Sequence, residues 1–184
     1  MRKERHLVGR VDPFAGGETL GDVADGFGGG RDRSAKLEIM RDSRLGTYGA
    51  LILLVSFAAK LSALAAIPDG YVVQSLIAAH ALGRGILPWM SVKLPYARND
   101  GLARNAGQPD AATAGMAAVL ALILALLSLS WSNGLLSALL AGLSGLGMAW
   151  LARRQIGGQT GDVLGGAEQV AETAILVLLA ARLS

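Results

Sequence analysis

The sequence predicts an all-α, polytopic membrane protein in which about five transmembrane helices form one bundle and the loops carry the functional motifs. Hydrophobic residues make up 52% of the 184 residues and charged residues only 17%, whereas soluble domains have about 25% charged residues. The charges lie between apolar runs of about 20 residues, the length of a helix that crosses a hydrocarbon core. No alternation typical of barrel strands is visible, so helices are the expected spanning element. This composition argues against disorder and against a nucleic-acid partner.

The apolar runs follow one another with short connections. The first contains a single charge, Lys60, and stops at the turn-forming triplet 68–70. The second is less hydrophobic and contains Pro88, whereas the third has no charge at all. A short break at 131–133 leads into the fourth. The expected spans are 47–67, 72–92, 111–130, 134–151 and 163–183.

The basic residues predict the orientation of these spans. Residues 1–46 lack the apolar core of a signal peptide. If they are cytoplasmic, fourteen of the 17 Lys and Arg residues fall on the cytoplasmic side, and the loops at 68–71 and 131–133 contain none. The positive-inside rule therefore predicts a multi-pass protein whose motif-bearing loops face the cytoplasm. In the fourth span, small residues such as Gly142 and Gly145 recur at helical spacing and predict helix-packing surfaces.

A group of carboxylates precedes the first span. The chain has no cysteine, so a metal must be held by oxygen ligands or by histidine. Glu18, Asp22 and Asp25 are spaced to share one face of a helix, where oxygen ligands favour a hard ion such as Mg²⁺. The glycines that follow, at 26 and 28–30, are expected to end that helix. The alternative is a solvated acidic face followed by a glycine linker.

Cations follow these carboxylates directly. Arginine and Mg²⁺ beside a membrane surface suit a substrate with a polyphosphate group. Attraction of a basic segment to anionic lipid is the alternative explanation, and composition does not separate the two. The cations of this segment are Arg31, Arg33, Lys36, Arg41 and Arg44.

A second polar segment, 157–172, is expected on the same side of the membrane. Gly158 permits unusual backbone geometry, Thr160 offers a neutral hydrogen-bonding group, and Asp162 adds a carboxylate. Glu168 and Glu172 enter the membrane region, where an ionisable group predicts a functional site, although Glu168 could instead complement a helix N-terminus. In the loop at 93–110, Arg98 is either an interfacial anchor or part of the same site.

Two of these segments resemble the cobalamin synthase family, also called adenosylcobinamide-GDP ribazoletransferase. They are LGDVADGFGGGRDRSAKLEIMRDSRLGTYG at 20–49 and IGGQTGDVLGGAEQVAE at 156–172, and YARNDGLA at 96–103 is similar to the family's central loop. The resemblance implies a Mg²⁺-dependent enzyme of the bacterial inner membrane that joins adenosylcobinamide-GDP to α-ribazole, or to its 5′-phosphate, and releases GMP. It also implies membrane lipid and other enzymes of cobalamin assembly as partners.

The resemblance also assigns roles to residues. It implies that Asp22, Asp25 and Asp162 are catalytic and that Glu18, Asp22 and Asp25 bind metal. The residues that it implies contact the substrate are Arg41, Asp42, Arg44, Arg98, Gly158 and Thr160.

The resemblance is weaker upstream of these residues. Gly16 stands where the family has His, and residues 1–17 have no counterpart, so they form an atypical segment before a single membrane domain at 18–184. The family's two preceding membrane segments are missing, which predicts a truncated, frame-shifted or mis-started member. Two alternatives follow. One is a catalytically inactive membrane scaffold, and the other is a small-solute transporter with Lys60, His80, Arg84 and Glu172 facing one another at mid-depth.

Overall fold

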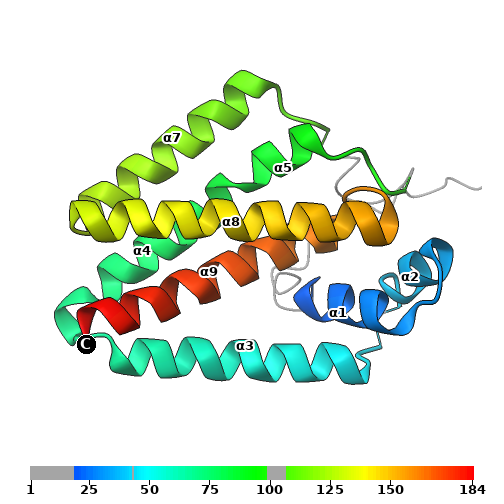
Figure 1. Cartoon of the computed structure of the whole chain (residues 1–184), viewed down its shortest axis with the longest axis horizontal. Coiled ribbons are helices and arrows are strands. Elements are labelled where there is room, and N and C mark those ends of the chain that lie inside the picture. The colour runs from blue at the N-terminus through cyan, green and yellow to red at the C-terminus, as the bar shows by residue number, and fades with distance from the viewer. Residues whose placement is uncertain (1–18, 43, 99–106) are drawn as a thin grey trace, which may run out of the picture.

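The computed structural model describes residues 19–42, 44–98 and 107–184, and in this part of the chain the regular structure is helical (Figure 1). The bundle is formed by long helices, whereas three shorter helices lie at one end of it or continue a long one. The helices are α1 (Thr19–Gly29), α2 (Arg33–Ile39), α3 (Thr47–Ala66), α4 (Asp69–Gly85), α5 (Leu87–Lys93), α7 (Ala111–Ser128), α8 (Trp131–Ile156) and α9 (Gly161–Leu183). This arrangement confirms the predicted all-α bundle.

Helix α9 is the centre of the bundle. It contacts α3, α4 and α8 along its length, and α7 packs on the outside against α4 and α8. Half of the most apolar window of α9 is buried, compared with 11–22% of the windows of α3, α7 and α8. The outer helices therefore present large apolar side chains outward, such as Phe57, Leu127 and Leu146. Within the described residues, α3, α7, α8 and α9 are long and apolar enough to cross a membrane.

Two apolar clusters hold the helices together. One joins α3, α4, α7, α8 and α9, and small residues such as Ala78 and Ala125 let the backbones approach around Ile175 and Leu179. The other lies where α1 and α2 meet the ends of α5, α8 and α9, and it includes Val23, Ile156 and Val163. Each of these residues except Val23 is fully buried.

The segment expected as the second span differs from the prediction. It consists of α4 and then α5, with the break at Ile86, and α4 is not among the helices long and apolar enough to cross a membrane. Pro88 stands in the first turn of α5, where its missing N–H group costs no helical hydrogen bond. A proline at this position favours the start of a new helix over a continuation of the old one.

Helix α8 is longer than the expected fourth span. The break predicted at 131–133 is instead its first turn, and the chain reverses at Leu129 and Ser130. At its other end α8 continues past Arg153 and Arg154 to Gly157, whose φ of 76° ends the helix in the left-handed conformation. The cations in its last turn lie beside the partly negative carbonyl end of the helix, which favours the extension.

The alternating directions of the long helices bring three polar segments to one end of the bundle (Figure 1). The described residues of these segments are 19–42 and 44–46, 94–98 and 107–110, and 157–162. We call these residues the polar end. Helices α1 and α2 lie across it, next to the start of α3 and the end of α8. The opposite end consists of the tight connections at 67–68 and 129–130.

Candidate active site

Asp25 binds the start of α3 through both carboxylate oxygens. Oδ2 accepts a hydrogen bond from the backbone N–H of Gly46 at 2.7 Å, and Oδ1 accepts one from Gly49 at 2.8 Å. The carboxylate therefore occupies the anion-binding end of the helix, where N–H groups have no partner within the helix. A Cβ atom on Gly46 or Gly49 would overlap the Asp25 carboxyl group, so the contact requires glycine at both positions. Asp25 is 8% exposed and joins α1 to α3.

Asp22 lies on the same helix as Asp25 but in a more open position. Helix α1 crosses α9 where Thr19 packs on Gly165 and where Leu20 and Val23 pack on Gly166. Asp22 stands one turn after Thr19 and is half-buried. Asp162 stands one turn before Gly165 on α9, so Asp22 and Asp162 each lie within one helical turn of a residue at this crossing. Helix α1 continues through Gly26 and Gly28, which lie against residues 36–40 and Tyr48. It ends at Gly29, so the glycine run ends the helix as expected, although not at its first glycine.

The loops at 94–98 and 157–160 are joined by their backbones. Gln159 N–H donates to the Pro95 carbonyl at 2.8 Å, and Ala97 N–H donates to the Gln159 carbonyl at 2.9 Å. Gly158 lies directly against Pro95, and a Cβ atom there would overlap the Pro95 carbonyl oxygen. The fully buried Gln159 side chain completes the joint, since its Nε2 donates to the carbonyls of Ser91 and Leu94.

This joint places Arg98 beside the start of α9. Arg98 Nη2 lies 3.4 Å from Asp162 Oδ2, and the Thr160 hydroxyl lies 3.3 Å from the same oxygen. Thr160 also caps α9, because its hydroxyl accepts the N–H of Val163. Both charged side chains are largely buried, at 17% and 18% exposure. The buried Nη1 of Arg98 has no acceptor among the residues that the structure describes.

Two cations of helix α2 attach it to the joined loops and to the end of α8. Arg33 Nη2 donates to the Ala97 carbonyl at 2.8 Å, and Lys36 Nζ donates to Gln155 Oε1 on α8. Asp32 caps α2 by accepting the Ala35 N–H at 2.9 Å. The sequence singled out Arg33 and Lys36 as cations for a phosphate, but their partners here are protein oxygens. Apart from their residue types, nothing in the sequence indicated that Arg33, Lys36 and Gln159 attach these segments to one another.

The segment after α2 is exposed. Arg44 and Asp42 form a local ion pair, with Nη2 2.6 Å from Oδ2, and 88% of the Arg44 side chain is exposed. The Arg44 guanidinium lowers the pKa of Asp42, and the Asp42 carboxylate raises the pKa of Arg44. Arg41 lies beside this pair and is also exposed. The substrate-binding roles expected for these three residues remain predictions.

The described carboxylates fit a metal only in part. Glu18 lies outside the described residues, and both oxygens of Asp25 already accept N–H groups. Among the residues that the structure describes, no three His, Asp or Glu side chains are grouped closely enough to hold a metal ion. Asp22 and Asp162 remain at the polar end. Mg²⁺ in phosphate-binding sites usually takes one or two carboxylates together with substrate phosphates and water, and this donor set meets that requirement.

A second charged group lies at mid-depth between α3, α4 and α9. The buried Glu172 accepts Lys60 Nζ at 3.0 Å and faces His80 Nδ1 at 2.5 Å. One turn away, Arg84 pairs with Glu168 at 2.9 Å. The structure thus brings together the residues that the transporter alternative requires. They contact one another across the helices, and such pairing is how ionisable groups are retained inside a membrane bundle.

Comparison with known proteins assigns the family. The family model described as cobalamin-5-phosphate synthase matches residues 18–180. The chain belongs to this family. The cobalamin-5-phosphate synthase match includes both stretches that carried the resemblance in the sequence and every described residue of the polar end.

Relatives of the family agree with this assignment. The chain is 47% identical over 163 residues to a protein of Bradyrhizobium diazoefficiens and 46% identical over 171 residues to one of Sinorhizobium medicae, both named adenosylcobinamide-GDP ribazoletransferase. These alignments cover 88% of this chain but only 63% and 65% of the relatives. The chain therefore spans slightly less than two thirds of their length. No solved structure matches it.

Proposed function

We propose that the polar end transfers the adenosylcobinamide-phosphate group of adenosylcobinamide-GDP to α-ribazole, or to its 5′-phosphate, with release of GMP. Membership of the cobalamin-5-phosphate synthase family supports the proposal, as do relatives named for this transfer. The substrates, the inner-membrane location, the cytoplasmic orientation of the polar end and partnership with other enzymes of cobalamin assembly are parts of the same proposal.

The observation that carries the proposal is the position of Arg98. Its guanidinium is held beside Asp162 by the joined loops, and its buried Nη1 lacks an acceptor among the described residues. A buried donor without a partner is costly, and a guanidinium is suited to phosphate oxygens. A diphosphate substrate would supply the missing acceptor. Arg98 would then hold the phosphate next to the two carboxylates of the polar end.

The proposed chemistry is a displacement at phosphorus. A ribazole hydroxyl oxygen forms a bond to the phosphorus nearer the cobinamide, and the bond from that phosphorus to the bridging oxygen of GMP breaks. The hydroxyl proton passes to a carboxylate of the site, for which Asp22 and Asp162 are the described candidates and Glu18 a third outside the described residues. Arg98 binds and orients the diphosphate. A bound Mg²⁺, held by Asp22 and Asp162, would neutralise charge on the phosphate oxygens.

Release of GMP tests the proposal directly. The full chain in liposomes receives both substrates and Mg²⁺, and GMP is measured by chromatography. We expect Arg98→Gln, Asp22→Asn and Asp162→Asn each to lower the rate at least about 100-fold, as expected for groups that act on charge in the transition state. Asp69→Asn, at the opposite end of the bundle, is the matched control and should leave the rate unchanged.

Binding measurements separate the alternatives. If the wild-type chain binds adenosylcobinamide-GDP but releases no GMP at any Mg²⁺ concentration, the chain is an inactive scaffold. If GMP forms at the wild-type rate in both Asp22→Asn and Asp162→Asn, the proposed site is wrong. Arg98→Gln should weaken binding of the diphosphate as well as turnover, because its proposed role is to hold the phosphate.

A further inference from the structure

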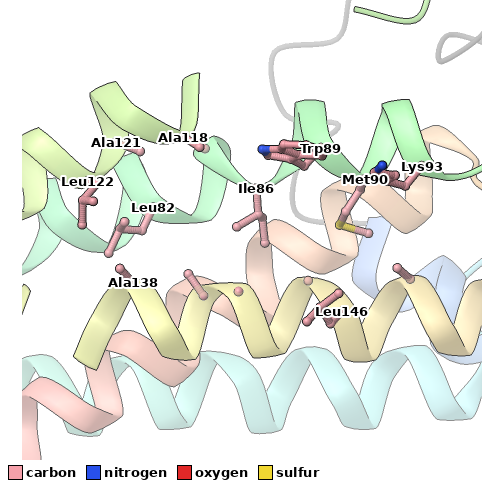
Figure 2. A pocket seen from close by; sticks show the side chains of 15 residues that line it. Leu82, Ile86, Trp89, Met90, Lys93, Ala118, Ala121, Leu122, Ala138 and Leu146 are labelled. Atoms are coloured by element: carbon pink, nitrogen blue, oxygen red, sulfur yellow. The ribbon is translucent and has the colours of Figure 1, made fainter. Parts of the chain in front are cut away.

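A groove runs along the outside of the bundle between α4, α5, α7 and α8 (Figure 2). Its volume is about 460 Å³, within the roughly 300–1,000 Å³ typical of ligand sites. Leu82 and Ile86 form one wall, Ala118 and Leu122 the opposite wall, and α8 from Ala138 to Ala149 the floor. It is separate from the candidate active site, since none of Asp22, Arg98 or Asp162 lines it.

The lining of the groove is apolar except at one end. Among the described residues that line it, Lys93 is the only charged one, and the others are aliphatic, aromatic, methionine or glycine. A nucleotide or a sugar would find almost no hydrogen-bonding partner along the groove. Gly142 on the floor has no neighbouring atom within 4 Å of the position that a Cβ would take, so helix α8 is bare there. The small residues expected to pack helices together therefore leave a space here.

The dimensions of the groove match one leaflet of a bilayer. The floor from Ala138 to Ala149 contains twelve residues, and the eleven steps between them span about 16 Å at 1.5 Å per residue. One leaflet contributes half of a hydrocarbon core about 30 Å thick. The rim is formed by exposed apolar side chains such as Leu146 and Trp89, so the groove opens toward the lipid.

Positive charge gathers where the groove reaches the polar end. Lys93 Nζ lies 5.2 Å from the centre of the Trp89 ring, and Figure 2 shows both side chains at this end of the groove. No carboxylate partner is recorded for Lys93 in the described part of the chain. Arg153 is one turn beyond Ala149 on the same face of α8, and Arg154 lies over the Trp150 ring. Tryptophan and lysine at a helix end are typical of the membrane interface.

We propose that this groove binds one acyl chain of an anionic glycerophospholipid, with the lipid phosphate at Lys93. The acyl chain covers the bare floor of α8 at Gly142, and the ammonium group of Lys93 neutralises the headgroup. The lipid thereby fills the space between α7 and α8 beside the break at Ile86. This site takes a lipid as a ligand and is independent of the proposed transfer reaction.

Native mass spectrometry of the detergent-purified chain tests the proposal. The probes are phosphatidylglycerol and phosphatidylcholine with identical acyl chains. We expect one retained phosphatidylglycerol per chain and at least 5-fold weaker retention of phosphatidylcholine. Gly142→Leu should abolish retention because the new side chain fills the groove. Gly147→Leu is the matched control, since Gly147 lies on the same helix, is exposed and has open space around it. Lys93→Gln should remove the preference for phosphatidylglycerol while the acyl chain still binds.

A second measurement does not depend on retention in the gas phase. In a Trp131→Phe, Trp150→Phe background Trp89 is the remaining tryptophan, and brominated phosphatidylglycerol should quench its fluorescence strongly. Gly142→Leu should abolish this quenching, whereas Gly147→Leu should not. Equal retention of both lipids by the wild type, or unchanged retention and quenching in Gly142→Leu, would overturn the proposal. It would also be overturned if a second copy of the chain, detected as a dimer that Gly142→Leu disrupts, occupied the groove.

Discussion

At the residue scale, polar side chains that look alike in sequence have different tasks. Asp25 binds two backbone N–H groups at the start of α3, whereas Asp162 faces Arg98. The difference arises from the backbone that surrounds each carboxylate. Glycines at 46 and 49 admit the Asp25 carboxylate to the helix end, and an ordered turn at Thr160 holds Asp162 toward the loop that carries Arg98.

Removal of the Asp25 carboxylate should destabilise the bundle. Asp25→Ala leaves two buried N–H groups of α3 without an acceptor, and the expected loss is about 2 kcal/mol of unfolding free energy. Denaturation in detergent followed by circular dichroism measures it. Asp69→Ala, an exposed acidic residue in the first turn of α4, should change stability by less than about 0.5 kcal/mol. Equal stability of the Asp25→Ala and Asp69→Ala variants would rule out the capping role.

Asp32 should make the attachment of α2 sensitive to acid. Hydrogen bonds from the Ala35 N–H and the Ser34 hydroxyl lower the pKa of Asp32 below its ordinary value. A lowered folded-state pKa means that the stabilisation is complete above the unfolded pKa of about 3.9 and is lost as pH falls through the lower folded value. The protection factors of the α2 amides, which are exchange rates relative to those of an unfolded chain at the same pH, should therefore fall as the pH is lowered below about 4. Asp32→Asn keeps a capping oxygen without a titrating charge, so its exchange should lack this acid-dependent step.

At the scale of elements, two kinds of joint hold the helices in place. The loops at 94–98 and 157–160 are joined by backbone hydrogen bonds, whereas α3, α4 and α9 are joined at mid-depth by charged side chains. The first joint sets the distance between Arg98 and Asp162. The second fixes how α9 is placed between its neighbours, because Glu172 accepts from Lys60 of α3 and faces His80 of α4.

The loop joint can be broken by one methyl group. Gly158→Ala would push a Cβ atom into the Pro95 carbonyl and separate Arg98 from Asp162. We expect turnover to fall at least 10-fold, since small displacements of positioning groups have large effects on rate. Gly161→Ala, at the first residue of α9 and with open space around it, is the control. If both variants release GMP at the wild-type rate, the joint does not position the site.

Loss of Glu172 should destabilise the bundle more than loss of Glu168. Glu172→Ala leaves the largely buried Lys60 and the half-exposed His80 without their carboxylate. Removal of one partner of a buried pair costs up to about 3–5 kcal/mol. Glu168→Ala removes a pair whose arginine is 64% exposed, which should cost about 1 kcal/mol or less. Thermal unfolding in one detergent compares the two. A smaller loss for Glu172→Ala than for Glu168→Ala would contradict the assignment.

At the scale of the whole molecule, the alternating helices separate a polar end from an end made of tight turns (Figure 1). Six of the twelve described basic residues lie in the polar end, and Lys93, Arg153 and Arg154 lie directly beside it. The positive-inside rule predicts that such an end faces the cytoplasm.

Single cysteines introduced by substitution should report this orientation without background labelling, because the native chain contains no cysteine. A membrane-impermeant maleimide added to intact cells should label Asp69→Cys and Ser132→Cys but not Glu38→Cys. All three positions are exposed, so each should react once the membrane is opened. Labelling of Glu38→Cys in intact cells would show that the polar end faces outward.

The sequence by itself determined the fold class, the end of the bundle where the motifs gather and the family. These follow from properties that are local in sequence: an apolar run long enough to span lipid, the placement of basic residues between such runs, and motif letters. The break at Ile86 and the cap formed by Thr160 also depend on residues close in sequence. Pro88 by itself was nevertheless not enough to predict that the second span divides into two helices.

Only the tertiary structure decided which polar groups are partners. Asp25 bonds to Gly49, Arg33 to Ala97 and Gln159 to Leu94 across 24 to 65 residues of chain, and no spacing rule connects such positions. The groove over Gly142 could not be predicted from the sequence either, because a small residue in a membrane helix permits either close packing or a gap. Which of the two occurs depends on where the neighbouring helix crosses, and that crossing is fixed by the packing of the whole bundle.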